Sequence, residues 1–188
     1  SSDVCSSDLS VEGNILDMDY SSFVGLFPMP TRHGMTMGEL ALMFNEELKI
    51  HCDLEVIKVK GWKRTLYSES WGRQWVPPSP NIPTVESAHT FSGTVHFEGT
   101  NISEGRGTTM PFLYIGAPYI DGDQLAEKMN RLKLPGVYFR PIYFQPTFHK
   151  GKDQVCGGVH IHVLNRKTFN SFEAGIYLLS TIAQLYPK

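Results

Sequence analysis

The 188-residue sequence lacks most of the short motifs that mark common enzyme classes. It has no GxSxG segment, no P-loop, no HExxH and no GxGxxG followed by an acidic residue. These absences disfavour the usual serine hydrolase, nucleotide, zinc protease and dinucleotide interpretations. The three cysteines, Cys5, Cys52 and Cys156, form no CxxC pair, and their number is odd. A zinc site, a redox motif or a disulfide framework is therefore not expected.

Excess charge and long apolar runs are also lacking. The net charge is −2, with 17 basic and 19 acidic residues of both signs interspersed. This balance provides no basic surface for nucleic acid or for an anionic membrane. The longest apolar stretch, residues 176–186, is too short and interrupted to cross a bilayer. We expect a globular protein with no nucleic-acid partner and no membrane span.

The first ten residues, SSDVCSSDLS, fit neither a helical nor a strand period. We interpret residues 1–10 as a tail that is disordered or not native to the protein, such as a translated cloning remnant. No signal peptide is visible and the chain does not begin with Met. Because the expected tail hides where the native protein begins, this absence carries little weight against export.

The first half of the remaining sequence predicts two helices, one strand and a long loop. Thr36 and Glu39 form a capping-box pattern at the start of a helix with one apolar stripe. The alternation in residues 54–59 predicts an amphipathic strand. Residues 61–83 hold three tryptophans and many prolines, which predict a stiff, irregular loop. A short helix is expected over residues 84–91.

The second half alternates predicted strands and helices. Strands are expected over residues 111–120, 136–148 and 155–164, and capping residues Asp121 and Asn170 open two further helices. With no internal repeat or linker, this order predicts one α+β domain over residues 11–188. We expect a mixed, partly antiparallel sheet with helices packed on it.

The segment from Phe97 to Thr109 has the richest chemistry in the chain. It contains two carboxylates, Glu98 and Glu104, the amide of Asn101 and the guanidinium of Arg106, between glycines that permit close backbone approach. Glycosidases use a pair of carboxyl groups, and arginine can grip an anionic substrate group. The alternative is a glycine-rich loop whose Glu and Arg side chains form a structural ion pair.

Three further groups are candidates for binding. Arg32 and His33 precede the first helix, whose N-terminus favours anions. Trp75 and the other tryptophans, Trp62 and Trp71, can stack on a sugar ring, although loop anchors are the commoner use. His160 and His162 point to one face of a predicted strand, but a metal site needs a further ligand with suitable spacing. No metal and no cofactor are expected.

Several segments resemble the exo-β-N-acetylmuramidases of the NamZ family, which was long a domain of unknown function. The resemblance is carried by residues 30–40, 75–84 and 97–109, with smaller matches at 116–118, at 139–141 and in the strand from Cys156 to His160. It covers the chain from about residue 11 to its end. The FEGTN-SEGRGTT stretch is long and unusual, which makes chance a poor explanation.

The resemblance implies a two-domain enzyme with its active site in the cleft between the domains. It implies that this chain is the C-terminal domain, truncated at both ends, and that a Rossmann-like N-terminal domain of the same polypeptide is missing. The reaction would be hydrolysis of a β-1,4 bond that releases N-acetylmuramic acid from the non-reducing end of peptidoglycan fragments. Residues of this wall of the cleft would be Arg32, His33, Asn81, Glu98, Asn101, Glu104 and Arg106.

Three interpretations remain open after the sequence analysis. The first is half of a glycosidase, with Glu98 and Glu104 as catalytic candidates, which alone would be inactive. The second is a non-catalytic module that binds muropeptide saccharide. The third, weaker one is a metal-dependent hydrolase that uses His160 and His162. For the parent enzyme, a secreted or periplasmic location is expected.

Overall fold

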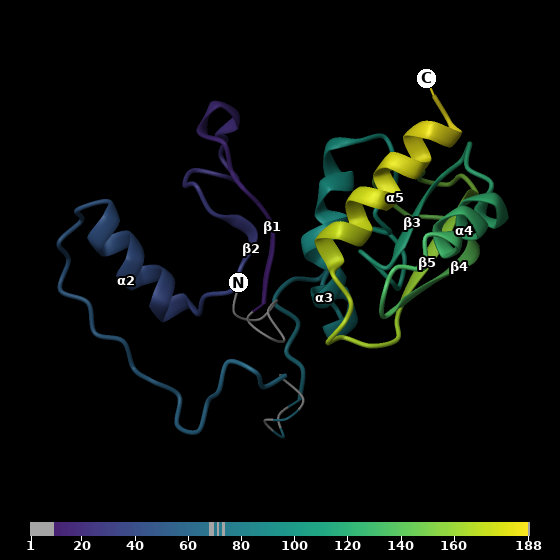
Figure 1. Ribbon diagram of the computed structural model, residues 1–188. Coiled ribbons are helices and arrows are strands. Elements are labelled where there is room, and N and C mark those ends of the chain that lie inside the picture. The colour runs from purple at the N-terminus through teal and green to yellow at the C-terminus, as the bar shows by residue number, and fades with distance from the viewer. Residues whose placement is uncertain (1–9, 68–69, 71, 73, 188) are drawn as a thin grey trace. The chain divides into compact units, whose positions relative to one another are not determined.

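The computed structural model describes residues 10–67, 70, 72 and 74–187, so nearly all of the expected N-terminal tail lies outside the described residues. The chain divides into two compact units, residues 1–76 and residues 77–188 (Figure 1). Each unit is considered by itself. Both combine helices with antiparallel strands, which confirms the α+β class.

In its described residues, the first unit contains a two-stranded sheet and one α-helix. Strands β1 (Val11–Ile15) and β2 (Pro30–His33) pair antiparallel, and a short 3-10 helix, η1 (Met18–Tyr20), lies in their connection. Helix α2 spans Met37–Glu47. The predicted capping box is confirmed, because Thr36 and Glu39 each accept a hydrogen bond from the other's backbone N–H.

The predicted strand over residues 54–59 is wrong, since the segment has no regular structure. A strand requires a hydrogen-bonding partner, and the described sheet of this unit contains β1 and β2 alone. Val56 instead packs on α2, where a Cβ added at Gly38 would lie 2.6 Å from its side chain. Ile57 and Val59 remain exposed. The apolar alternation is thus real, but it serves packing on a helix rather than sheet formation.

The second unit has a three-stranded antiparallel sheet in the order β3-β5-β4. Its strands are β3 (Tyr114–Ala117), β4 (Val137–Phe144) and β5 (Cys156–Val163). They occupy the predicted positions and are shorter than expected.

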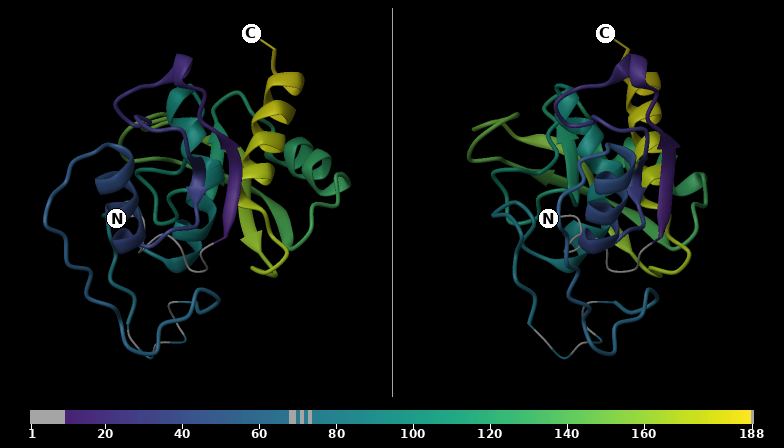
Figure 2. Two further views of the ribbon diagram at one scale, coloured as in Figure 1. Left: turned by 60° about the vertical axis from the view of Figure 1, so that its left-hand side comes forward. Right: turned by 90° about the vertical axis from the view of Figure 1, so that its left-hand side faces the viewer.

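Four helices complete the second unit. They are α3 (Val85–Thr94), the 3-10 helix η3 (Val95–Gly99), α4 (Gly122–Arg131) and α5 (Ser171–Leu185). Asp121 and Asn170 cap α4 and α5 as predicted. Helix α3 extends three residues beyond its predicted end at Phe91. Figure 2 shows these helices from two further sides, with α3 in teal, α4 in green and α5 in yellow.

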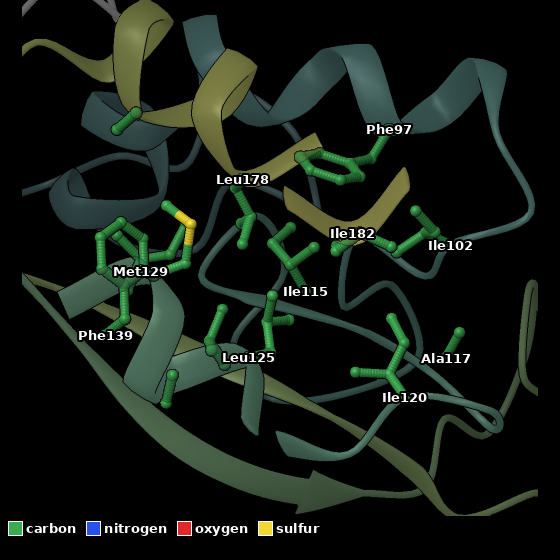
Figure 3. Close-up of a cluster of buried hydrophobic side chains, with 14 of the residues drawn as sticks. Phe97, Ile102, Ile115, Ala117, Ile120, Leu125, Met129, Phe139, Leu178 and Ile182 are labelled. Carbon is green, nitrogen blue, oxygen red and sulfur yellow. The ribbon is translucent and has the colours of Figure 1, made fainter. Parts of the chain in front are cut away.

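The core of the second unit lies between one face of the sheet and helices α4 and α5 (Figure 3). Ile115, Phe139 and Val159 contribute from the strands, and Leu125 and Leu178 from the helices. All five side chains are almost completely buried. Phe97 and Ile102 belong to the same cluster, so the polar segment identified in the sequence is anchored on the core by its apolar members.

Helices α3 and α5 approach closely through glycines. A Cβ added at Gly93 would lie 1.8 Å from the carbonyl oxygen of Ser171, and one at Gly175 would lie 2.2 Å from that of Gly93. The Ser171 hydroxyl accepts a hydrogen bond from the Gly93 N–H and donates one to the Thr90 carbonyl. This contact fixes α3, and with it the start of the segment that follows.

Candidate functional site

The polar ribbon, residues 97–109, runs along the outer side of strand β3. Ser103 pairs with Gly116 of β3 through two backbone hydrogen bonds, of 2.8 and 3.0 Å. Gly105 has a φ of +81°, and a Cβ there would lie 2.8 Å from the Tyr114 carbonyl oxygen. Both features require glycine at this position. The ribbon is therefore fixed by backbone geometry and not only by its side chains.

Glu104 is the central carboxylate of the ribbon and is fully buried, with 0% of its side chain exposed. Its Oε1 accepts a hydrogen bond from Arg106 at 2.8 Å and its Oε2 one from Lys150 at 2.9 Å. Burial alone would raise the pKa of Glu104, but the hydrogen bonds from Lys150, Arg106 and its own backbone together lower it. The carboxylate is therefore ionised and held in one position.

Arg106 connects this buried carboxylate to an exposed one. Its Nη1 contacts Glu104, and its Nη2 lies 2.6 Å from Oε1 of Glu98, whose side chain is 41% exposed. The guanidinium also lies 5.0 Å from the centre of the buried Phe112 ring. Burial opposes ionisation, yet the two glutamates raise the pKa of Arg106. One arginine thus orients both candidate carboxylates of the sequence.

Lys150 was missed by the sequence analysis, although it holds the ribbon together. Its Nζ donates hydrogen bonds to the carbonyl oxygens of Phe97 at 2.6 Å and Ile102 at 3.1 Å, as well as to Glu104. It lies 46 residues from Glu104 in the loop after β4. No sequence spacing indicates such a contact. The loop is held beside the ribbon by Thr147, whose hydroxyl donates a hydrogen bond to the Gly107 carbonyl.

Asn101 lies on the exposed side of the ribbon and accepts a hydrogen bond from the Tyr119 hydroxyl at 3.0 Å. Partial burial raises the pKa of Tyr119, although this hydrogen bond acts in the opposite direction. The Tyr119 ring contacts Tyr186 edge-on. Tyr119, a second residue that the sequence analysis missed, therefore fixes the orientation of the amide.

The structure brings together Glu98, Glu104 and Arg106 of the predicted site residues. The other candidates Arg32, His33 and Trp75 belong to the first unit. Arg32 is buried in β2 and forms an ion pair with Glu12 of β1. The His33 Nδ1 accepts a hydrogen bond from the Met35 N–H at 3.1 Å.

Trp75 and Asn81 lie in the loop between α2 and α3. The Trp75 ring is half-buried, and its buried indole N–H has no hydrogen-bond partner in the described part of the chain. Asn81 is half-buried in the second unit. Trp71, another tryptophan of the predicted platform, lies outside the described residues.

His160 and His162 lie on the same face of β5, as predicted, with ring centres 3.9 Å apart. Arg140, which is paired with His160 in the register of β4 and β5, lies beside both rings. Its Nε is 3.3 Å from Nε2 of His162, and its Nη2 is 3.3 Å from Nδ1 of His160. We call these three residues the Arg–His cluster. Burial, then His162 and Arg140, lower the pKa of His160 to about 4.

Within residues 10–67, 70, 72 and 74–187, no group of three or more His, Cys, Asp or Glu side chains is arranged to hold a metal ion. In the same part of the chain, no helix has both the length and the apolarity needed to span a bilayer.

The fold and the ribbon together define an α+β protein in which one guanidinium holds two carboxylates, and a pair of carboxyl groups is what most glycosidases use. Comparison of the sequence with models of protein families identifies one family. The C-terminal model of the exo-β-N-acetylmuramidase NamZ family matches residues 89–188, and the N-terminal model matches residues 5–86. The chain belongs to this family.

Named relatives agree with this assignment. The chain is 50% identical over 178 residues to the peptidoglycan β-N-acetylmuramidase NamZ of Bacillus subtilis (strain 168). The matched residues make up 95% of this chain and 43% of that protein. Two solved structures of DUF1343 family proteins from Bacteroides fragilis are also similar. One has a TM-score of 0.87 at 39% identity, covering 96% of this chain and 48% of that one. The other has a TM-score of 0.65 at 32% identity, covering 95% and 46%.

The chain thus spans less than half the length of the relatives that it matches. The family comparison divides it between residues 86 and 89, near the boundary of the two compact units at residue 76. The sequence analysis expected residues 11–188 to be C-terminal domain throughout, whereas the N-terminal family model matches residues 5–86. That match also begins within the expected tail.

Proposed function

We propose that this chain forms part of an exo-acting β-N-acetylmuramidase that releases N-acetylmuramic acid from the non-reducing end of peptidoglycan fragments. The observation that carries the proposal is the polar ribbon, in which a half-exposed carboxylate and a buried one share Arg106. Family membership and the name of the B. subtilis relative support the substrate class. The rest of the polypeptide would complete the site.

The geometry favours different roles for the two glutamates. Glu98 keeps 41% of its side chain exposed, so its carboxylate is accessible to a substrate. Glu104 has no exposed surface and is ionised between two cations, so it cannot donate a proton to a leaving group. We assign the acid–base or nucleophilic role in this chain to Glu98. We assign to Glu104 the role of positioning Arg106.

The alternative of a non-catalytic saccharide-binding module is distinguished by activity. The complete gene product that contains this chain should release the chromophore from a chromogenic N-acetylmuramic acid β-glycoside, and not from the N-acetylglucosamine analogue. If neither substrate is cleaved, the enzyme proposal fails and the binding module is favoured. Culture fractionation of the same protein tests the proposed secreted or periplasmic location.

The role of Glu98 is tested in that complete protein with Glu98→Gln, which removes the charge and the titratable proton but keeps the shape. General acid–base catalysis contributes roughly 100- to 10,000-fold, so kcat should fall by more than about 100-fold. Glu127→Gln, at an exposed carboxylate in α4, is the matched control and should retain full activity. If Glu98→Gln keeps near wild-type kcat, the carboxylates of this ribbon are structural.

A further inference from the structure

The Arg–His cluster lies outside the proposed catalytic groups and has no role in the core. Residues of β5 alternate, so Val159 and Ile161 are buried in the core while His160 and His162 point to the opposite face of the sheet. Arg140 is exposed on the same face. Three polar side chains on adjacent strands therefore meet on the sheet face opposite the hydrophobic core.

The hydrogen bonds of the cluster fix its protons. Arginine is always a donor, so His160 Nδ1 and His162 Nε2 must both be acceptors toward Arg140. A neutral imidazole with one accepting nitrogen carries its proton on the other. The outer nitrogens, Nε2 of His160 and Nδ1 of His162, are therefore N–H donors.

The charge of the cluster follows from these protons. Both rings are neutral and the guanidinium is positive, so the cluster has a net charge of about +1 near neutral pH. The ring centres approach to 3.9 Å, which two imidazolium cations would oppose. A metal cation would meet the positive charge of Arg140 and outward N–H groups in place of lone pairs. The cluster is built to receive an anion.

The guanidinium retains the donors that an anion needs. Arg140 uses two of its five N–H donors for the imidazoles, and no other partner of it is found in the described part of the chain. The remaining donors include those of Nη1, which form with Nη2 the planar fork that binds carboxylate in a bidentate manner. The two histidines hold this fork in one orientation and reduce the entropy lost on binding.

Aromatic rings border the cluster on both sides. Tyr114 contacts the His160 ring edge-on, with centres 4.9 Å apart. Tyr138 lies opposite His162 in the register and is 47% exposed. Such rings accommodate the apolar face of a sugar or a methyl group beside a carboxylate.

We propose that Arg140, oriented by His160 and His162, is a binding site for a carboxylate of the muropeptide substrate. This inference rests on the proposed function for the identity of the substrate. The carboxylate can come from the lactyl group of N-acetylmuramic acid or from the stem peptide, because both offer the same planar anion.

The test is a binding titration of the 188-residue chain, followed through the ring resonances of His160 and His162 by NMR. The probes are N-acetylmuramic acid, N-acetylglucosamine as the sugar without a carboxylate, and N-acetylmuramoyl dipeptide, whose lactyl carboxyl is in an amide bond. Saturable shifts of both rings are expected with N-acetylmuramic acid and not with N-acetylglucosamine. Equal shifts with the dipeptide would show that the site accepts either carboxylate, shifts with the dipeptide alone would assign it to the stem carboxylate, and shifts with N-acetylmuramic acid alone would assign it to the lactyl group.

Arg140→Gln should weaken binding by at least about 10-fold, because it removes a charge-assisted bidentate contact. Arg140→Lys keeps the charge without the fork and should bind with intermediate affinity. Arg131→Gln, at an exposed arginine of α4, is the matched control and should bind like wild type. Unchanged binding in Arg140→Gln, or no response of either ring to any acid, would overturn the inference while leaving chromophore release by the complete protein intact.

Discussion

The fully buried carboxylate of Glu104 makes a sharp prediction about stability. In Glu104→Gln the two cations lose their charged partner, and breaking a buried ion pair costs about 3–5 kcal/mol. Lys150 and Arg106 keep 20% and 21% of their side chains exposed, so water can solvate them in part. We therefore expect Glu104→Gln to lower the free energy of unfolding by about 2–4 kcal/mol.

Lys150→Met should cost more than Glu104→Gln, because the carboxylate that it leaves behind has no access to water. This variant also removes the donor to the carbonyl oxygens of Phe97 and Ile102. We expect a loss of about 3–5 kcal/mol. The double variant should lose less than the sum of the two single losses, since both disrupt one network.

The assay must distinguish the two units of the chain. All three tryptophans lie before residue 77, so tryptophan fluorescence during urea unfolding reports on the first unit. Hydrogen exchange of β3 and β5 reports on the second. Both variants should weaken protection in the second unit, whereas Glu127→Gln should change stability by less than about 1 kcal/mol as an exposed pair.

The pH dependence provides an independent check. The folded-state pKa of Glu104 is lowered from 4.5, so its contribution is present above that value and is lost as the pH falls through the folded pKa. The stability difference between wild type and Glu104→Gln should therefore shrink below about pH 4.5. The reasoning is refuted if Glu104→Gln unfolds within about 0.5 kcal/mol of wild type, or costs more than Lys150→Met.

Two further predictions concern other parts of the second unit. Gly93→Ala places a Cβ 1.8 Å from the Ser171 carbonyl oxygen and should lower the free energy of urea unfolding by at least about 3 kcal/mol. Gly99→Ala, with open space around its Cβ, should leave that free energy nearly unchanged. Equal effects of the two variants would contradict the close contact between α3 and α5. The His160 ring should titrate by NMR near pH 4, and its neutral folded form should add stability that is present above pH 6.5 and is lost as the pH falls toward 4. In Arg140→Gln its midpoint should rise but stay below 6.5, because burial is the larger cause; a midpoint unchanged by the variant would argue against the Arg140 contact.

The sequence predicted features that depend on near neighbours along the chain. The caps at Thr36, Asp121 and Asn170 were correct because their hydrogen bonds close within three residues. The shared face of His160 and His162 follows from the two-residue period of a strand in the same way. The predicted strand over residues 54–59 failed because strand formation depends on a partner elsewhere, which an alternating pattern does not supply.

The candidate site was predicted in composition but not in arrangement. Glu98 and Glu104 look equivalent in the sequence, yet one is half-exposed and the other is sealed between two cations. What separates them is Lys150, which reaches Glu104 from a loop 46 residues away. Burial and long-range contacts of this kind are set by tertiary packing and leave no local pattern.

The two polar clusters of the second unit differ in a way that fits a divided task. Glu98, Glu104, Arg106 and Lys150 carry two negative and two positive charges, so the first cluster is neutral overall and leaves a single carboxylate at its surface. The Arg–His cluster carries one positive charge and presents donors. Tyr114 connects them, because its carbonyl faces Gly105 while its ring contacts His160. For the proposed substrate, a sugar acid with one group to be held and one bond to be broken, a neutral cluster beside a cationic one would avoid placing a second anion at the proposed carboxylate site.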